Sequence, residues 1–431
     1  MTALALSSPH RRGACPGLSA PMPTGDGLLV RLLPIGTISL DAFSKLCAAA
    51  RLHGNGIVEV TARGSIQIRG LSATSALRFA DVIAGLDIAT SDGIPVLSNP
   101  LAGLDPEEVL DAGARAAELR RALRESSLPA RLAPKVSVVI DGGGALNLDE
   151  LAADVRLRAT TTNGGVVLRV GLGGDETSAT FLGAVAQDHA VDAALRLLDV
   201  IARNGRAARA RDVIAADGGA AFRAAIADLL IPNPPSPRSA HKPADPIGTY
   251  PLRDGTRACG FGLAFGHADA AALEQLTDTA SAAGAVGLRA APGRTLLIIG
   301  LALEAAASLT AVAENLGFIV RAGDPRRHVF ACAGAPICSS AHIAARALAP
   351  RIAEIAARQL GPSFDIHVSG CAKGCAHVKA AALTVVGEPA GCALIADGRP
   401  HDASFATVPS DELLDAIERH ARARQCEGGH V

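Results

Sequence analysis

Four cysteines in the C-terminal quarter of the chain have the spacing of a metal-cluster site. Cys332 and Cys338 are separated by five residues, and Cys371 and Cys375 by three. Soft thiolates are the ligands of iron–sulfur clusters, and four of them complete a [4Fe–4S] cubane. Glycines lie in both loops and let the backbone wrap closely around a ligand. The pattern therefore predicts a [4Fe–4S] cluster on these four cysteines.

Two other interpretations of the cysteines stay open. Structural zinc sites usually place two to four residues between paired ligands, so the five-residue spacing is wide for zinc. Free cysteines are among the most buried residues, so all four could be core residues, although the glycines beside them favour loops. Nine cysteines in 431 residues are too few for a disulfide framework and indicate a reducing compartment.

Composition excludes several classes of function. The formal net charge is −1, whereas nucleic-acid-binding proteins usually carry a clustered positive excess. No apolar run is long enough to cross a bilayer, so we expect no membrane span. The N-terminal arginine pair follows the short apolar stretch, the reverse of a secretory signal. We therefore expect a cytoplasmic protein with neither a nucleic-acid nor a membrane partner.

The chain reads as a duplication. Residues 27–71 and 258–301 each show a strand, a glycine turn, an amphipathic helix and two further strands. Half-modules of this kind cannot close a sheet alone, so we expect the two copies to pair. Each copy is followed by a predicted helix, at 106–125 and at 340–360.

The segments after those helices also correspond. Each helix precedes a strand that ends in a glycine-bearing loop, at 135–144 and at 365–375. The first loop has plain glycines where the second has Cys371 and Cys375, so only one copy is expected to hold metal.

These patterns predict an α+β fold with a duplicated architecture, in which two ferredoxin-like half-domains join two larger mixed α/β lobes. A proline-rich stretch between the copies reads as a linker. The predicted divisions are an N-terminal arm (1–25), the first half-domain (26–95), the first large lobe (96–230), the linker (231–246), the second half-domain (247–320) and a lobe with the cluster (321–431).

The segments ACAGAPIC (331–338) and SGCAKGC (369–375) resemble the cluster motif of the sulfite/nitrite reductase superfamily. In that superfamily the last cysteine, Cys375 by position, also bridges the cluster to sirohaem. LLVRLLPIG and VTARGSIQIRG resemble the segments that hold the carboxylates of the macrocycle. RRGACPGLSAPMPTGDG, HGNG and NPLAGLDP are similar, more narrowly, to the precorrin-3B synthase branch. The resemblance extends from residue 11 to about residue 400.

The resemblance implies a site for a tetrapyrrole with many carboxylates. Arginine suits such a site because its planar fork can bind a carboxylate with two hydrogen bonds. Gln67 and Arg69 lie two residues apart on a predicted strand and therefore share a face. Any single arginine is more often a solvated surface charge. By position the candidates are Arg31, Arg63, Gln67, Arg69 and Lys135, with Asn99 as a weaker one.

Several departures from the reductase pattern weaken sulfite or nitrite as the substrate. Ser137 stands where the reductases have the second lysine of a Lys-x-Lys pair, and Gly64 replaces the glutamine after Arg63. GIPVLSNP also lacks an expected arginine. The loss of cations that bind small anions leaves a pocket for a tetrapyrrole as substrate rather than as cofactor, so we expect sirohaem to be absent.

The resemblance implies an oxidoreductase, a monooxygenase of aerobic cobalamin biosynthesis. Its substrate would be precorrin-3A, hydroxylated at C20 with formation of a lactone, using O2 and electrons from NADH. The chain has no dinucleotide-binding fingerprint, so those electrons are expected through a separate reductase. A mononuclear non-haem iron would suit an oxygenase, but the histidines show no facial-triad spacing. No catalytic residue is assigned.

Two alternatives stay open. A sirohaem-dependent sulfite or nitrite reductase would use the same cysteine motif, and a non-catalytic iron–sulfur electron carrier or tetrapyrrole carrier would need less of the chain. The visible spectrum of the purified protein would distinguish them, because sirohaem adds strong red bands that a lone cluster lacks.

Overall fold

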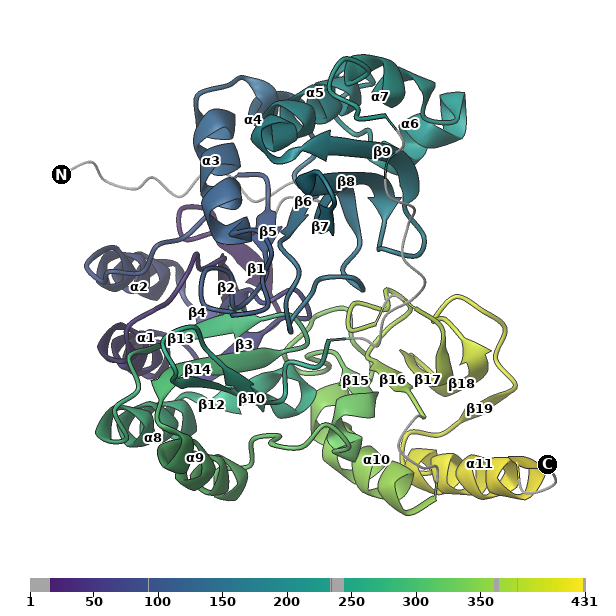
Figure 1. The fold of residues 1–431 in the computed structure, drawn as a ribbon. Helices are drawn as coiled ribbons and strands as arrows, with labels where there is room; N and C mark the ends of the chain where they lie inside the picture. The colour runs from purple at the N-terminus through teal and green to yellow at the C-terminus, as the bar shows by residue number, and fades with distance from the viewer. Residues whose placement is uncertain are drawn as a thin grey trace.

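The computed structural model describes residues 16–91, 93–232, 234, 244–359, 364–377 and 379–428. Most of the predicted arm and most of the predicted linker lie outside the described residues. The described strands form four sheets, two in a central module and one in each of two lobes (Figure 1). No described helix is long and apolar enough to cross a membrane.

The first half of the central module is a sheet covered by two helices. Apolar residues of helix α1 face the sheet, and Ser39 caps the helix by accepting a hydrogen bond from the Ala42 backbone. The strand order is β1-β2-β4-β3-β12. The elements are β1 (Met22–Thr24), β2 (Gly27–Leu32), α1 (Leu40–His53), β3 (Ile57–Val60), β4 (Ile66–Leu71) and α2 (Ala73–Ala84).

The second half repeats this plan with the strand order β10-β11-β14-β13. Its short strand β12 leaves the half and joins the sheet of the first half. The elements are β10 (Gly248–Pro251), β11 (Arg257–Gly262), η2 (Ala264–Gly266), β12 (His267–Asp269), α8 (Ala270–Ala282), β13 (Gly287–Ala291), β14 (Thr295–Leu301) and α9 (Leu303–Asn315).

The two halves share one hydrophobic core. β12 pairs antiparallel with β3, and Ile38 of the first half forms a bridge with Leu288 on β13. Helices α1, α2, α8 and α9 lie together on the outer side of the module (Figure 1). Phe43 and Phe79 pack in the same cluster as Phe261. The halves are therefore interleaved rather than simply adjacent.

The first lobe has a five-stranded sheet in the order β5-β6-β7-β8-β9, with helices packed on its apolar face. Its elements are β5 (Val96–Ser98), α3 (Ala112–Arg124), α4 (Leu128–Arg131), β6 (Val138–Asp141), β7 (Ala153–Thr162), β8 (Gly165–Gly174), β9 (Thr180–Ala186), η1 (Gln187–His189), α5 (Ala190–Arg203), α6 (Ala210–Asp217) and α7 (Ala220–Ala225).

The second lobe has the same sheet plan in the order β15-β16-β17-β18-β19. In both lobes the first three strands pair in parallel and the remaining pairs are antiparallel. Its elements are η3 (Pro325–His328), β15 (Val329–Ala331), α10 (Ala345–Gln359), β16 (Ile366–Ser369), β17 (Ala381–Glu388), β18 (Gly391–Gly398), β19 (Ala406–Val408) and α11 (Leu413–Gly428).

The repeated sheet plan confirms the predicted α+β duplication, with corrections to two helix boundaries. The helix predicted from residue 106 begins at Ala112, because Asp111 caps it by accepting a hydrogen bond from the Ala114 backbone. The helix predicted from residue 340 begins at Ala345. In each lobe, the residues before the helix form a loop that returns toward the sheet.

Candidate functional site

The cysteines lie on two loops that leave neighbouring parallel strands. Cys332 follows β15, and Cys371 comes two residues after β16. Because β15 and β16 are parallel, their carboxyl ends meet at one edge of the sheet. The Gly370 backbone N–H donates to Cys332 Sγ at 3.1 Å, and the His342 backbone N–H donates to the Gly370 carbonyl at 2.7 Å. The topology therefore brings the two cysteine loops together at the same edge of the sheet.

Glycines allow these loops to interlock. Gly334 has a φ of 69°, and a Cβ there would stand 2.3 Å from the Ala345 nitrogen. A Cβ on Gly370 would stand 2.6 Å from the Ala341 side chain. Any larger residue at either position would force the loops apart.

The four thiols lie within electrostatic reach of one another. Burial raises the pKa of the Cys332 thiol, and the nearby Cys338 and Cys371 raise it further. Burial and the other three cysteines likewise raise the pKa of Cys375. Such a group of thiols is easily ionised only when a metal compensates the charge of the thiolates.

The donor set fits a [4Fe–4S] cluster better than a single ion. No group of three or more His, Cys, Asp or Glu side chains in the described part of the chain is placed to hold one metal ion. In a cubane, each thiolate binds a different iron, so the four sulfurs stand further apart than the ligands of one zinc ion. Four soft thiolate donors on two adjoining loops match the ligand set of such a cluster.

A row of polar side chains crosses four strands of the central module. Arg31 on β2 is opposite Gln67 on β4, Gln67 is opposite Glu59 on β3, and Glu59 is opposite His267 on β12. Arg31 Nε donates to Gln67 Oε1 at 2.8 Å, and Gln67 Nε2 donates to Glu59 Oε2 at 2.7 Å. We call these four residues the polar row.

The polar row faces the second lobe. Arg346 on α10 forms an ion pair with Glu59. Arg69, next to the row on β4, pairs with Asp26 at 3.2 Å and with Glu59 at 4.0 Å, and its Nη2 donates to the carbonyl of Ile337 in the first cysteine loop at 3.5 Å. The sheet face that was predicted to bind carboxylates therefore lies against the predicted cluster loop.

The charges on this face leave a positive excess. Arg31, Arg69 and Arg346 are set against the carboxylates of Glu59 and Asp26. Burial, and then the nearby Arg346, lower the pKa of His267 to about 4, so this imidazole is neutral at pH 7. Its Nδ1 is buried and has no hydrogen-bond partner among the described residues. Arg31 contacts the neutral amide of Gln67 rather than a carboxylate, so its charge is the most available to a ligand.

Arg63 and Lys135 do not join the polar row. Arg63 lies in the turn before β4, six residues from Arg69, which is roughly 20 Å along an extended chain. It donates to the Ala152 carbonyl at 2.9 Å and to Ser137 Oγ at 3.3 Å. Lys135 is exposed near the start of β6. Both therefore belong to the border with the first lobe, where Ser137, which replaces the expected lysine, accepts a hydrogen bond from Arg63.

Asn99 occupies in the first lobe the place that Cys332 has in the second. It follows β5 as Cys332 follows β15, and its Oδ1 accepts a hydrogen bond from the Gly142 backbone at 2.6 Å. Its amide nitrogen donates to Asp141 at 2.8 Å and to the carbonyls of Gly143 and Leu146. Asn99 thus holds loops together, and it also lines the cavity described below.

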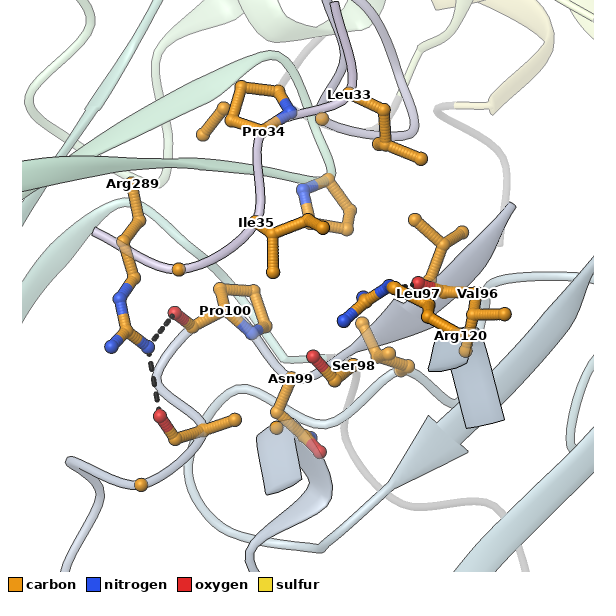
Figure 2. Close-up of a pocket in the computed structure, with 18 of the residues that line it drawn as sticks. Leu33, Pro34, Ile35, Val96, Leu97, Ser98, Asn99, Pro100, Arg120 and Arg289 are labelled. Atoms are coloured by element: carbon orange, nitrogen blue, oxygen red, sulfur yellow. Dashed lines mark hydrogen bonds between the residues drawn. The ribbon is translucent and has the colours of Figure 1, made fainter. Parts of the chain in front are cut away.

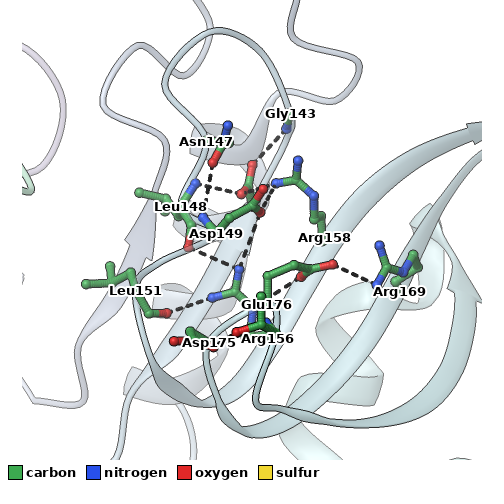
Figure 3. A network of polar contacts seen from close by, with 12 residues as sticks. Gly143, Asn147, Leu148, Asp149, Leu151, Arg156, Arg158, Arg169, Asp175 and Glu176 are labelled. Carbon is green, nitrogen blue, oxygen red and sulfur yellow. Dashed lines mark hydrogen bonds and ion pairs between the residues drawn. The ribbon is translucent and has the colours of Figure 1, made fainter. Parts of the chain in front are cut away.

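A network of ion pairs in the first lobe surrounds the loop that follows β6 (Figure 3). It was not predicted from the sequence. The fully buried Asp141 accepts from the Gly143 and Leu148 backbone and pairs with Arg158, which also contacts Asp149 at 2.7 Å. Alternation on β7 places Arg156 on the same face as Arg158. The only sequence signal was the repeated arginine in a strand pattern.

A cavity of about 330 Å³ lies between the two halves and the first lobe (Figure 2). Arg289 donates across its border to the carbonyls of Pro100 and Ala102, and Arg120 donates to the Val96 carbonyl. The cavity is at the lower end of the range for small-molecule sites, and two of the predicted residues, Arg63 and Asn99, line it. The other predicted residues Arg31 and Gln67 lie in the polar row and do not line this cavity.

Comparisons with known proteins agree with this architecture. A family model described as the nitrite/sulfite reductase ferredoxin-like half domain matches residues 20–83. The chain is 40% identical to a precorrin-3B synthase of a Sinorhizobium species over 96% of this chain and 88% of the relative. It is 26% identical to a ferredoxin sulfite reductase of Mycolicibacterium paratuberculosis, over 76% of this chain and 65% of that one.

The fold has a solved counterpart. The structure of the NirA protein of Mycobacterium tuberculosis superposes with a TM-score of 0.75, at 22% identity, over 92% of this chain and 80% of NirA. This likeness confirms the predicted reductase-like fold.

Proposed function

The chain belongs to the precorrin-3B synthase family of the sulfite/nitrite reductase-like superfamily and is an oxidoreductase of cobalamin biosynthesis, and from this we propose that it hydroxylates precorrin-3A at C20. The observation that carries the proposal is the face formed by the polar row with Arg69 and Arg346, where three arginines are set against two carboxylates beside the first cysteine loop. A substrate with many carboxylates is suited to such a face.

The residues of the site have separate tasks in this proposal. Arg31 and Arg69 bind carboxylates of the macrocycle, and Gln67 keeps Arg31 in place through its fixed amide. Glu59 holds Arg346 of the second lobe at the same face. Arg63 and Lys135 bind carboxylates at the border with the first lobe. Together these contacts orient the macrocycle over the cysteine loops.

Cys332, Cys338, Cys371 and Cys375 hold a [4Fe–4S] cluster in this proposal. When bound, such a cluster supplies electrons one at a time. The reaction consumes O2, two electrons and two protons: one oxygen atom becomes the C20 hydroxyl and the other leaves as water, while the ring A acetate closes the lactone. The electrons come from NADH through a separate reductase.

The centre that activates O2 has no assigned ligands. A mononuclear non-haem iron would suit the chemistry, but no group of three or more His, Cys, Asp or Glu side chains among the described residues is placed for one ion. The proposal therefore includes O2 and the macrocycle as reactants and assigns no residue to oxygen activation. Sirohaem has no part in it.

A second candidate is a sirohaem-dependent sulfite or nitrite reductase, because the four cysteines lie on loops of the reductase type. The contact between Arg63 and Ser137 weighs against it. That contact turns the Arg63 guanidinium toward a hydroxyl at the position where the reductases have a second lysine to bind the anion.

Turnover with labelled oxygen tests the proposal. Purified protein given precorrin-3A, a reductant and ¹⁸O2 should place one labelled atom in the product as the new hydroxyl. Omitting either O2 or the reductant should abolish conversion. Stoichiometric sirohaem in the protein, with turnover of sulfite or nitrite under argon, would establish the reductase instead.

A further inference from the structure

Arg294 contacts both cysteine-bearing segments. It comes from the tight turn between β13 and β14 in the central module, where it has a φ of 62°. Its Nη2 donates to the carbonyl of Ala376, the residue after Cys375, at 3.0 Å. Its guanidinium also lies over the ring of Phe330, two residues before Cys332, at 5.1 Å from the ring centre.

The surrounding structure fixes this arginine. The Leu263 backbone donates to the Arg294 carbonyl at 2.9 Å. A Cβ on Gly266 would stand 2.8 Å from Arg294 Cδ, so glycine there leaves room for the side chain. Phe330 is stacked in turn on His377, with ring centres 4.2 Å apart. A residue in the left-handed region costs of order 1–3 kcal/mol, so its surroundings hold it there.

Arg294 is a mostly buried cation without a matching carboxylate. Burial alone lowers the pKa of its guanidinium to about 10, so it stays protonated at neutral pH. In the described part of the chain, no Asp or Glu forms an ion pair with it, and the polar groups near it are the Ala376 carbonyl and the imidazoles of His367 and His377. Buried charges are normally paired.

We propose that Arg294 is the counter-cation of the [4Fe–4S] cluster and raises its reduction potential. The inference rests on the cluster of the proposed function. Four thiolates give such a cluster a net negative charge, which increases on reduction. A nearby buried cation stabilises the more negative, reduced form, and net charge and hydrogen bonds are known to set these potentials. Arg294 is a positioning residue here, because it acts on the cluster through space and through the Ala376 backbone.

Two kinds of substitution distinguish the effect of the Arg294 charge from the effect of its hydrogen bond to Ala376. Arg294→Gln keeps a hydrogen-bond donor but removes the charge, and Arg294→Lys keeps the charge. Arg294→Met is a second neutral variant. The measurement is a redox titration of the cluster-containing protein, followed by electron paramagnetic resonance. In the neutral variants the ratio of reduced to oxidised cluster at a fixed potential should fall about tenfold, which corresponds to about 59 mV for a one-electron couple.

Lys373 is the exposed comparison: it lies between Cys371 and Cys375, its charge acts on the Cys375 thiol, and its Nζ donates to Ser340 Oγ at 2.7 Å. Lys373→Gln should shift the potential less, and its shift should shrink at high salt, because exposed charges are screened. The shift in Arg294→Gln should persist at high salt, and Arg294→Lys should stay near the unmodified protein.

The outcomes distinguish this inference from the proposed function. An intact cluster with unchanged potential in both neutral variants would overturn the inference while leaving the hydroxylation unaffected. An equal shift in Arg294→Lys would assign the effect to lost contacts rather than charge, and would also overturn it. If the unmodified protein held zinc or no cluster, the inference would fail together with its premise.

Discussion

Gln67 has both ends of its amide fixed by charged neighbours. Its oxygen accepts from Arg31 and its nitrogen donates to Glu59, which in turn pairs with Arg346. The orientation of the amide is therefore determined, and with it the position of the Arg31 guanidinium. A neutral residue between a cation and a carboxylate keeps them apart, so no carboxylate in the described part of the chain forms an ion pair with Arg31.

Arg31→Ala should weaken binding of the tetrapyrrole. A hydrogen bond to a charged group contributes about 1.5–3 kcal/mol, so affinity should fall roughly ten- to a hundredfold. Binding is measured by titration of precorrin-3A under anaerobic conditions, and the spectrum of the cluster should not change. The control is Arg51→Ala, since Arg51 is an exposed residue that pairs with Glu274. Equal affinity in the two variants would show that Arg31 has only a surface role.

Asn99→Ala should destabilise the first lobe without affecting the cysteine loops. The change removes one acceptor and three donor contacts and leaves Asp141 and the Gly142 backbone short of partners. The free energy of unfolding should fall by about 2–4 kcal/mol, as measured by chemical denaturation. Asn204→Ala, which removes a single contact to the Val200 carbonyl, should cost about 1 kcal/mol. Similar losses in both would contradict the scaffold role of Asn99.

Strand register decides which polar side chains meet, and this limited what the sequence could predict. Gln67 and Arg69 were expected on one face because they lie two residues apart on one strand. Glu59 and His267 come from strands in different halves of the chain, and only their pairing in one sheet brings them together. Local periodicity carries no information about such long-range pairing.

Gly334→Ala should prevent assembly of the cysteine loops. The residue has a positive φ, and a Cβ would stand 2.3 Å from the Ala345 nitrogen. Iron and acid-labile sulfide, expected near four each per chain in the unmodified protein, should both fall by more than half. Gly323→Ala is the control, because nothing lies within 4 Å of a Cβ there. Full iron content in Gly334→Ala would show that the loop tolerates a side chain and adapts.

The order of elements along the whole chain was predictable, but their interleaving was not. Matching sequences of strands, helices and glycine loops revealed the duplication, because each copy repeats its own local signals. The exchange of β12 between halves and the ion pair from Arg346 to Glu59 depend on how whole units pack. The first lobe shows the same limit, because the buried carboxylates around its glycine loop gave no distinct signal in the sequence.

Acid should destabilise the molecule through His267, which lies where the two halves and the second lobe meet. Its neighbours are Glu59, Arg346 and the Phe265 backbone. The pKa of His267 is about 4 in the folded protein and about 6.5 when unfolded, so between these values the unfolded chain binds a proton that the folded chain does not. The free energy of unfolding should therefore decrease, by up to about 3 kcal/mol, as the pH falls from about 6.5 to about 4.

His267→Gln provides the comparison for this prediction. Glutamine does not titrate, so the variant should lose less stability over the same pH interval, as measured by thermal or urea unfolding at several pH values. Parallel pH profiles for the two proteins would show that other groups dominate the acid response.

The strand exchange has a consequence for synthesis on the ribosome. β3 ends at Val60, whereas its partner β12 begins only at His267, after the whole first lobe has been made. At about 5–20 residues per second, the nascent first half waits roughly 10–40 s with one edge of its sheet unpaired. Unpaired edges recruit strands from other chains, and charges on such strands oppose this. Glu59, which later pairs with His267, places a charge on this waiting edge, and such a charge opposes pairing with strands of other chains.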